Sequence, residues 1–364
     1  MKVFITGSNG FVGSVVTAAL LSQKHKVFAL CRGDVKRVHD SLQTVRPQGD
    51  WRAGELHVMH GDVAVSGLGL DRDSRRVMEV DLVVHAAGHT KFDADDPLHE
   101  EVNVRGARNV AELSAELRWP RFIHVSTAYV CGHKTGRIEE KGFPDSTQAH
   151  NPYEESKSRA EYEVSRILKN QATMFRPSIV VGALGNDWAG SLPTTYTGYY
   201  GYFHGFWRLK RKLSPVDTWD MGETRIPGDS GAEINLIPAD ALAGMIMSLV
   251  DHPESDGGIY HGVSPTGPHY SDLVALTLKH IGVRGGKIGY RLDPPVTALE
   301  RLISAGIGPF LPYVGENRTF STSNMGRFYD MAQVPAIGEE EIRRLIVPAI
   351  ECGFGTKTVQ VTRS

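Results

Sequence analysis

Thr6-Gly7-Ser8-Asn9-Gly10-Phe11-Val12-Gly13 stands near the amino end of this chain, directly after the apolar run Lys2–Thr6. From Val12 to Leu20, apolar residues then recur at helical spacing. In a strand–turn–helix unit of this kind, glycines permit a tight turn, let the backbone approach a pyrophosphate, and let the helix pack closely on the strand. The helix start supplies free N–H groups and a partial positive charge. We therefore predict a dinucleotide-binding loop, with a purely structural glycine turn as the alternative.

Strands and helices alternate along roughly the first 260 residues. Further strands are predicted at 27–30, 56–59, 81–85, 121–125, 173–176 and 259–261. Helices are predicted at 100–117, 153–168 and 241–250, the last with Asp240 as its cap. Strands that alternate with helices imply a parallel sheet with right-handed crossovers. We predict an α/β fold with a doubly wound, Rossmann-type parallel sheet.

The alternation stops after residue 182 and returns near residue 234. Residues 183–231 are rich in glycine, proline and aromatic side chains, and helices are predicted at 271–281 and 339–351 with an apolar segment at 296–307. We therefore expect a Rossmann domain from residues 1–182 and 232–262. A smaller, discontinuous substrate lobe is expected from residues 183–231 and 263–364.

The amino-acid composition limits the partners and the cellular location that we expect for this chain. The 364 residues are 41% hydrophobic and 23% charged, with a formal net charge of −2, so the basic footprint of a nucleic-acid-binding protein is missing. The three cysteines are widely spaced, and His85 and His89 stand at a strand end, so neither pattern predicts a disulfide or a metal site. No run approaches the ~18 apolar residues of a membrane span, and the apolar start is too short for a signal peptide. We expect a cytoplasmic protein, and leave a homodimer open.

The candidate catalytic residues come from one predicted helix and from the end of one predicted strand. Tyr153 and Lys157 are four residues apart on a predicted helix, so both side chains can point into one site. A phenol has an unperturbed pKa of about 10, and a nearby ammonium is expected to lower it. Ser126 and Thr127 follow the strand at 121–125, and a hydroxyl there can hold the substrate oxygen that the phenol protonates.

The choice of cofactor depends on the end of the second strand. An acidic residue there would accept bonds from the ribose 2′-OH of NAD, whereas this chain has Arg32, whose guanidinium matches a 2′-phosphate. We therefore predict NADP (NADPH), with NAD and a merely solvated Arg32 as alternatives. Asp62 follows the third strand and can either accept a bond from the adenine amino group or cap a turn.

Two further features each allow two interpretations. Residues 196–207 are strongly aromatic and precede a basic cluster at 208–212. They form either a packing helix with a solvated basic end, or an apolar wall for an acyl chain with cations for a phosphate-bearing carrier. Cys131 is either a thiol nucleophile or a small buried hydrophobic residue.

Taken together, these motifs resemble those of an extended short-chain dehydrogenase/reductase, in the branch of the fatty acyl-CoA and thioester reductases. The resemblance rests on residues 6–13, 30–32, 67–70, 84–88, 103–106, 124–129, 136–139, 153–157 and 175–182. It implies that the catalytic positions are Thr127, Tyr153 and Lys157, with Ser126 beside the nicotinamide. The implied cofactor-binding residues are Gly7, Ser8, Asn9, Gly10, Phe11, Val12, Gly13, Arg32, Asp62, Val63, Ala86, Ala87, Gly88, Asn103, Tyr153, Lys157, Pro177 and Ile179.

The expected function follows from the motifs and the resemblance together. We expect an NADPH-dependent reductase of an acyl thioester, either an acyl-CoA or an acyl group on a carrier protein. The first product would be an aldehyde, and further reduction to an alcohol stays open. The alternatives are a ketone or secondary-alcohol oxidoreductase, a sugar-nucleotide epimerase or dehydratase, and a non-catalytic nucleotide-binding subunit.

Overall fold

A seven-stranded parallel sheet is the centre of the computed structural model, which describes residues 1–71, 74, 79–92, 97–117, 120–169, 171–214, 217–290 and 292–356. Its strand order is β12-β7-β5-β4-β1-β2-β3, and every neighbouring pair is parallel. The strands are β1 (Lys2–Thr6), β2 (Lys26–Cys31), β3 (Glu55–His60), β4 (Leu82–His85), β5 (Arg121–Val125), β7 (Thr173–Pro177) and β12 (Ile259–Gly262). This order confirms the predicted doubly wound sheet.

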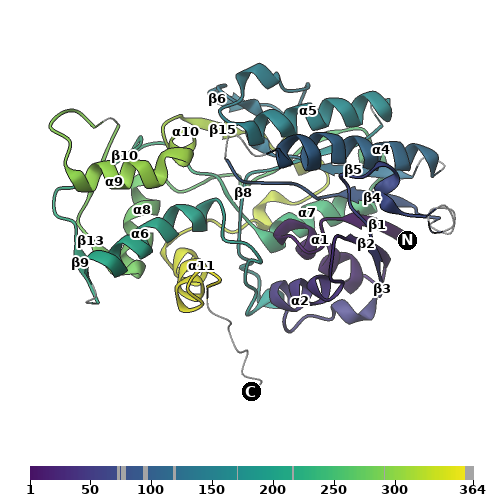
Figure 1. Cartoon of the computed structure of the whole chain (residues 1–364), viewed down its shortest axis with the longest axis horizontal. Helices are drawn as coiled ribbons and strands as arrows, with labels where there is room; N and C mark the ends of the chain where they lie inside the picture. The colour runs from purple at the N-terminus through teal and green to yellow at the C-terminus, as the bar shows by residue number, and fades with distance from the viewer. Residues whose placement is uncertain are drawn as a thin grey trace.

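Helices cover both faces of the sheet (Figure 1). Figure 1 shows α1 (Phe11–Ser22), α2 (Lys36–Val45) and α7 (Ala239–Asp251) on one face. The other face carries α4 (Gly106–Glu116), which continues the π-helical segment η3 (His99–Arg105), and α5 (Pro152–Ile167). One apolar core lies between the sheet and α1, α2 and α7, and another between the sheet and α4 and α5. Central strands buried on both faces account for their near-continuous apolar sequences.

A further apolar core lies beyond the carboxyl ends of the strands. It is built from α6 (Tyr199–Leu213), α8 (Tyr270–Ile281), α9 (Ala298–Ile307) and α11 (Glu339–Glu351), with α10 (Leu311–Val314) beside them. Short parallel pairs join distant segments: β8 (Ile179–Val181) with β11 (Leu236–Pro238), β6 (Gly136–Ile138) with β15 (Arg318–Phe320), β10 (Arg225–Pro227) with β14 (Lys287–Gly289), and β9 (Trp219–Asp220) with β13 (Val283–Arg284). The division into a Rossmann domain of residues 1–182 and 232–262 and a lobe of the other residues stays a prediction.

Asp240 does not cap α7 as expected. The helix begins two residues earlier than predicted, at Ala239, so Asp240 lies in its first turn. Its carboxylate accepts hydrogen bonds from the backbone N–H groups of Leu184 (2.9 Å) and Gly185 (2.7 Å). Asp240 therefore ties the turn after β8 to the start of α7.

The most apolar helices are short and buried inside the protein. α1 has 12 residues and α7 has 13, and both pack against the sheet. Among the described residues, no helix combines the length and the apolar character needed to cross a membrane.

Candidate active site

The glycine loop after β1 has no room for side chains at Gly7 and Gly13. Gly7 has a φ of +80°, and a Cβ there would lie 2.6 Å from the backbone nitrogen of Ala87. A Cβ on Gly13 would lie 2.1 Å from the carbonyl oxygen of Gly7. Gly10 caps α1 without a side-chain hydrogen bond, and the first turn carries no acidic residue. The loop therefore offers free N–H groups and a positive helix end, which fits the pyrophosphate of a dinucleotide.

The four predicted catalytic residues line one cavity of about 520 Å³. Ser126 and Thr127 directly follow β5, and α5 presents Tyr153 and Lys157 one turn apart. The start of α5 is fixed by Asn151, whose side chain accepts a hydrogen bond from the backbone N–H of Glu154 (3.0 Å). Parallel strands place their carboxyl ends at one edge of a sheet, so the glycine loop reaches the same cavity.

Lys157 is buried, with an exposed fraction of 4%. Its ammonium donates a hydrogen bond to the backbone carbonyl of Val125 (2.6 Å), just before Ser126. Burial disfavours the charged form and lowers the pKa of Lys157 to about 8, although the carboxylate of Glu161 opposes this shift. The ammonium also lies near the backbone of Gly88, because a Cβ added there would be 3.9 Å from it.

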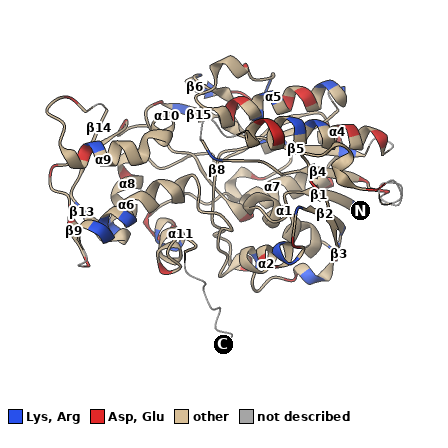
Figure 2. Ribbon diagram, viewed as in Figure 1, with Lys and Arg blue, Asp and Glu red and all other residues tan. Residues whose placement is uncertain are grey.

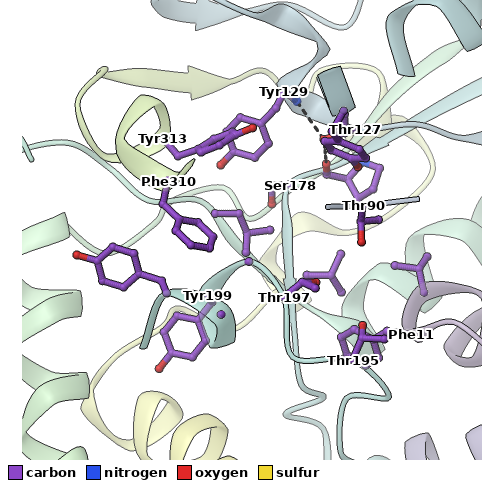
Figure 3. Close-up of a pocket in the computed structure, with 18 of the residues that line it drawn as sticks. Phe11, Thr90, Thr127, Tyr129, Ser178, Thr195, Thr197, Tyr199, Phe310 and Tyr313 are labelled. Carbon is purple, nitrogen blue, oxygen red and sulfur yellow. Dashed lines mark hydrogen bonds between the residues drawn. The ribbon is translucent and has the colours of Figure 1, made fainter. Parts of the chain in front are cut away.

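The pKa of Tyr153 departs from the expectation. Burial raises it to about 12, while a hydrogen bond with the side chain of Thr127 lowers it. The predicted lowering by Lys157 is wrong, because the lysine ammonium is turned to the carbonyl of Val125 and burial penalises the phenolate. Thr127 Oγ1 donates to the carbonyl of Pro177 (3.4 Å) and accepts from the N–H of Tyr129 (3.3 Å), as Figure 3 shows for the second bond.

Ser126 carries an unsatisfied hydroxyl in this cavity. Its Oγ is buried and has no hydrogen-bond partner among the described residues. A buried polar atom of this kind costs free energy unless something pairs with it. A bound ligand with a polar group at this point would supply the partner.

The predicted cofactor-binding residues fall into two groups. Besides Tyr153 and Lys157, the cavity is lined by Gly10, Phe11, Val12, Gly13, Ala86, Gly88, Pro177 and Ile179. The cavity walls do not include Gly7, Ser8, Asn9, Arg32, Asp62, Val63, Ala87 and Asn103. Asn103 is buried, and its amide bonds the backbone of His89 (2.7 and 2.9 Å) and the hydroxyl of Ser156 (2.8 Å). It therefore braces the loop after β4, and its direct contact with a cofactor stays a prediction.

Arg32 and Asp62 lie together at the carboxyl ends of β2 and β3. Arg32 is 65% exposed and forms an ion pair with Asp62 at 3.5 Å. Asp62 also accepts a hydrogen bond from the backbone N–H of Ala64 (2.9 Å), so its predicted role in a turn is confirmed. Its contact with adenine and the contact of Arg32 with a 2′-phosphate stay predictions.

An aromatic wall forms the far side of the cavity. Tyr199, Tyr202 and Phe203 of α6 line it, which fits the cavity-wall interpretation of this segment. Figure 3 shows Phe310 and Tyr313 on one side of the cavity and Phe11 on the other. The sequence analysis missed Phe310 and Tyr313, and also Phe92, which packs against both with ring centroids 5.7 and 5.6 Å away. No local pattern marks these three residues, because they come from segments far apart in the chain.

The basic end of α6 points away from this wall. Figure 2 shows its cations beside β9 and β13, at the tip of the molecule. Lys210 donates a hydrogen bond to the carbonyl of Asp217 (2.6 Å), and the guanidinium of Arg211 lies 4.7 Å from the ring of Trp207. The interpretation of these cations as carrier contacts therefore stays a prediction.

The surroundings of Cys131 favour a structural role. The residue is buried, and burial raises the pKa of its thiol. The thiolate is the reactive form of cysteine, so a raised pKa opposes nucleophilic catalysis. Cys131 packs in a small apolar cluster with Tyr129, Tyr313 and Phe320.

The sheet, the glycine loop and the Tyr–Lys helix are those of the extended short-chain dehydrogenase/reductase class, whose members are NAD(P)-dependent oxidoreductases. Within that class, the chain belongs to the male sterility protein family, whose model matches residues 5–246. This membership confirms the resemblance to the branch of the fatty acyl-CoA and thioester reductases.

Curated relatives agree with this family, and a solved structure agrees with the fold. The chain is 25% identical over 292 residues to a fatty acyl-CoA reductase of Drosophila melanogaster, covering 61% of this chain and 55% of that protein. It is 30% identical over 165 residues to fatty acyl-CoA reductase 8 of Arabidopsis thaliana, covering 39% and 33%. The terminal R domain from the myxalamid PKS-NRPS biosynthetic pathway superposes with a TM-score of 0.76 at 19% identity, covering 97% of this chain and 91% of that domain. The chain thus spans about half the length, or less, of these curated relatives.

Proposed function

We propose that this chain uses NADPH to reduce an acyl thioester to an aldehyde, with the carrier released as a free thiol. The observation that carries the proposal is the single cavity shared by the glycine loop, the predicted catalytic residues and the aromatic wall. Tyrosine and phenylalanine rings favour an apolar acyl group, whereas a sugar would bring hydroxyl groups against them and lose its hydrogen bonds to water. The names of the curated relatives, which are fatty acyl-CoA reductases, support the same substrate class.

The cofactor would be held by the loop at 7–13, with Arg32 at its 2′-phosphate. When bound, it supplies the hydride for the reduction. The free N–H groups at the start of α1 would bind the pyrophosphate, and the ammonium of Lys157 would bind the nicotinamide ribose. The orphaned hydroxyl of Ser126 is available as a further polar contact in the same cavity.

Tyr153 would act as the proton donor. A pKa of about 12 keeps its phenol protonated at neutral pH, which is the form needed to donate to an oxygen that gains negative charge. The hydroxyl of Thr127 would be a second donor to that oxygen. Lys157 would supply positive charge in the same cavity, and the low dielectric of a buried site strengthens its interaction with a negatively charged oxygen.

The test compares the variant Tyr153→Phe with the control variant Tyr162→Phe. Tyr162 lies on the same helix and is 60% exposed. Purified protein would be offered acyl-CoAs of increasing chain length, an acylated carrier protein and sugar nucleotides, while NADPH absorbance is followed. We expect turnover of acyl thioesters, a kcat about 10²–10⁴-fold lower in Tyr153→Phe, and little change in Tyr162→Phe. Turnover of sugar nucleotides alone, or an unchanged kcat in Tyr153→Phe, would refute the proposal.

A further inference from the structure

Three side chains with metal-binding atoms converge outside the reductase cavity. His133 follows the turn η4 (Ala128–Cys131), His150 precedes α5, and Glu316 lies between α10 and β15. Their ligand atoms all lie within 4.8 Å of one another. Glu316 Oε1 is 3.1 Å from His150 Nε2 and 3.7 Å from His133 Nδ1. Ligands about 2.0–2.1 Å from a tetrahedral zinc ion lie roughly 3.3 Å apart, so the spacing fits a single ion.

The surroundings of His150 suggest that a cation belongs here. Its side chain is 3% exposed, and carboxylates face both ring nitrogens: Glu154 at Nδ1 (2.9 Å) and Glu316 at Nε2. Nε2 lies 3.1 and 3.2 Å from the two carboxylate oxygens of Glu316. A histidine nitrogen and a carboxylate, both common zinc ligands, therefore face one another at a buried position.

Glu154 stands where a supporting carboxylate is found in known zinc sites. Histidine ligands commonly donate their second ring N–H to a carboxylate, which sets the tautomer and the ring orientation. Glu154 is fully buried, and it is itself held by the hydroxyl of Tyr313 (2.6 Å) and the backbone N–H of His150 (2.9 Å). This arrangement turns Nε2 of His150 towards Glu316, another member of the cluster.

Charge and access agree with this interpretation. Arg318 forms an ion pair with Glu316 through Oε2, which also lies 3.2 Å from His150 Nε2, while Oε1 is near both imidazoles. Two carboxylates, those of Glu154 and Glu316, contact His150, and Arg318 pairs with the second of them. His133 is 57% exposed, so a fourth position on the metal would face water.

We propose that His133, His150 and Glu316 bind one Zn²⁺ ion, with Glu154 supporting His150. Two imidazoles and one carboxylate suit zinc better than magnesium, which prefers six oxygen ligands. The ion would join the segment that carries Phe310 and Tyr313 to the segments that carry Thr127 and Tyr153, and so would hold the cavity wall in place. This site is independent of the proposed reductase function.

The experiment uses the full chain without an affinity tag, stripped of metal with EDTA and then titrated with ZnCl₂ by calorimetry. We expect one Zn²⁺ per chain, no comparable binding of Mg²⁺, and the visible absorption of four-coordinate Co²⁺ when cobalt replaces zinc. His133→Ala removes an exposed ligand and is expected to weaken Zn²⁺ binding at least about tenfold. The matched control is His57→Ala, which removes an exposed histidine paired with Glu55 on β3 and should leave the affinity unchanged.

Two results would overturn the proposal. One is the absence of saturable Zn²⁺ binding, in which case hydrogen bonds and ion pairs alone explain the geometry. The other is an equal loss of affinity in His57→Ala and His133→Ala, which would show that zinc binds to surface histidines without selectivity.

Discussion

Lys157→Met is expected to stabilise this protein at neutral pH while it removes activity. Burial lowers the pKa of Lys157 from 10.5 to about 8, and at 1.36 kcal/mol per pKa unit the folded state bears a cost of about 3 kcal/mol for the charged ammonium. Methionine has a similar length and no charge. Its introduction leaves the carbonyl of Val125 without its partner, which costs about 1 kcal/mol. The free energy of unfolding should therefore rise by about 2 kcal/mol at pH 7.

The sign of the pH dependence follows from the lowered pKa. Below about pH 8 the lysine is protonated in both the folded and the unfolded state, so the parent protein bears the whole cost. Between pH 8 and 10.5 the folded state releases its proton first, so the parent gains stability relative to the variant as the pH rises. The difference between them should shrink towards zero near pH 10.

Urea unfolding of both proteins at pH 7 and pH 10, followed by circular dichroism, measures this difference. Lys141→Met, at an exposed position, is the control and should show no such pH-dependent change. Reductase activity is measured in parallel and should fall about 10²-fold or more in Lys157→Met. A variant less stable than the parent at pH 7, or a stability difference that does not change with pH, would refute the reasoning.

Three further outcomes test the glycine loop, the cofactor preference and the buried ion pair. Gly13→Ala forces a Cβ to within 2.1 Å of the carbonyl oxygen of Gly7. This overpacking costs about 1–3 kcal/mol and should weaken dinucleotide binding by roughly 10–100-fold. The control is Gly205→Ala, whose Cβ would have no atom within 4 Å and should leave binding unchanged. Arg32→Ala should raise the KM for NADPH about tenfold or more and leave the KM for NADH nearly unchanged. Equal changes in the two KM values would contradict the proposal that Arg32 binds the 2′-phosphate. Arg176→Met removes the guanidinium that donates hydrogen bonds of 2.7 and 2.9 Å to the fully buried carboxylate of Glu161. The free energy of unfolding, measured with urea, should fall by about 3–5 kcal/mol. A fall of less than about 1 kcal/mol would disprove this reasoning.

Much of the fold could be predicted from the sequence, because its signals are local. The apolar strand, the glycine spacing and the following helix are set within the first 22 residues, and all of them form as expected. The four-residue spacing of Tyr153 and Lys157 places both side chains in one cavity by helical geometry alone. Cap assignments are less secure, as Asp240 shows, because a carboxylate can bond a neighbouring loop instead of its own helix.

Properties that depend on distant neighbours were decided only by the tertiary structure. Tyr313 is 159 positions away from Glu154, yet the two side chains hydrogen-bond beside the cavity. The pKa of Tyr153 is raised by the burial that the folded chain creates, not lowered by the lysine one turn away. His133, His150 and Glu316 meet beside the pairing of β6 with β15, which joins segments far apart in the chain. Periodicity and motif spacing report on contacts within a few residues, whereas burial, charge balance and cavity walls arise from segments that meet after folding.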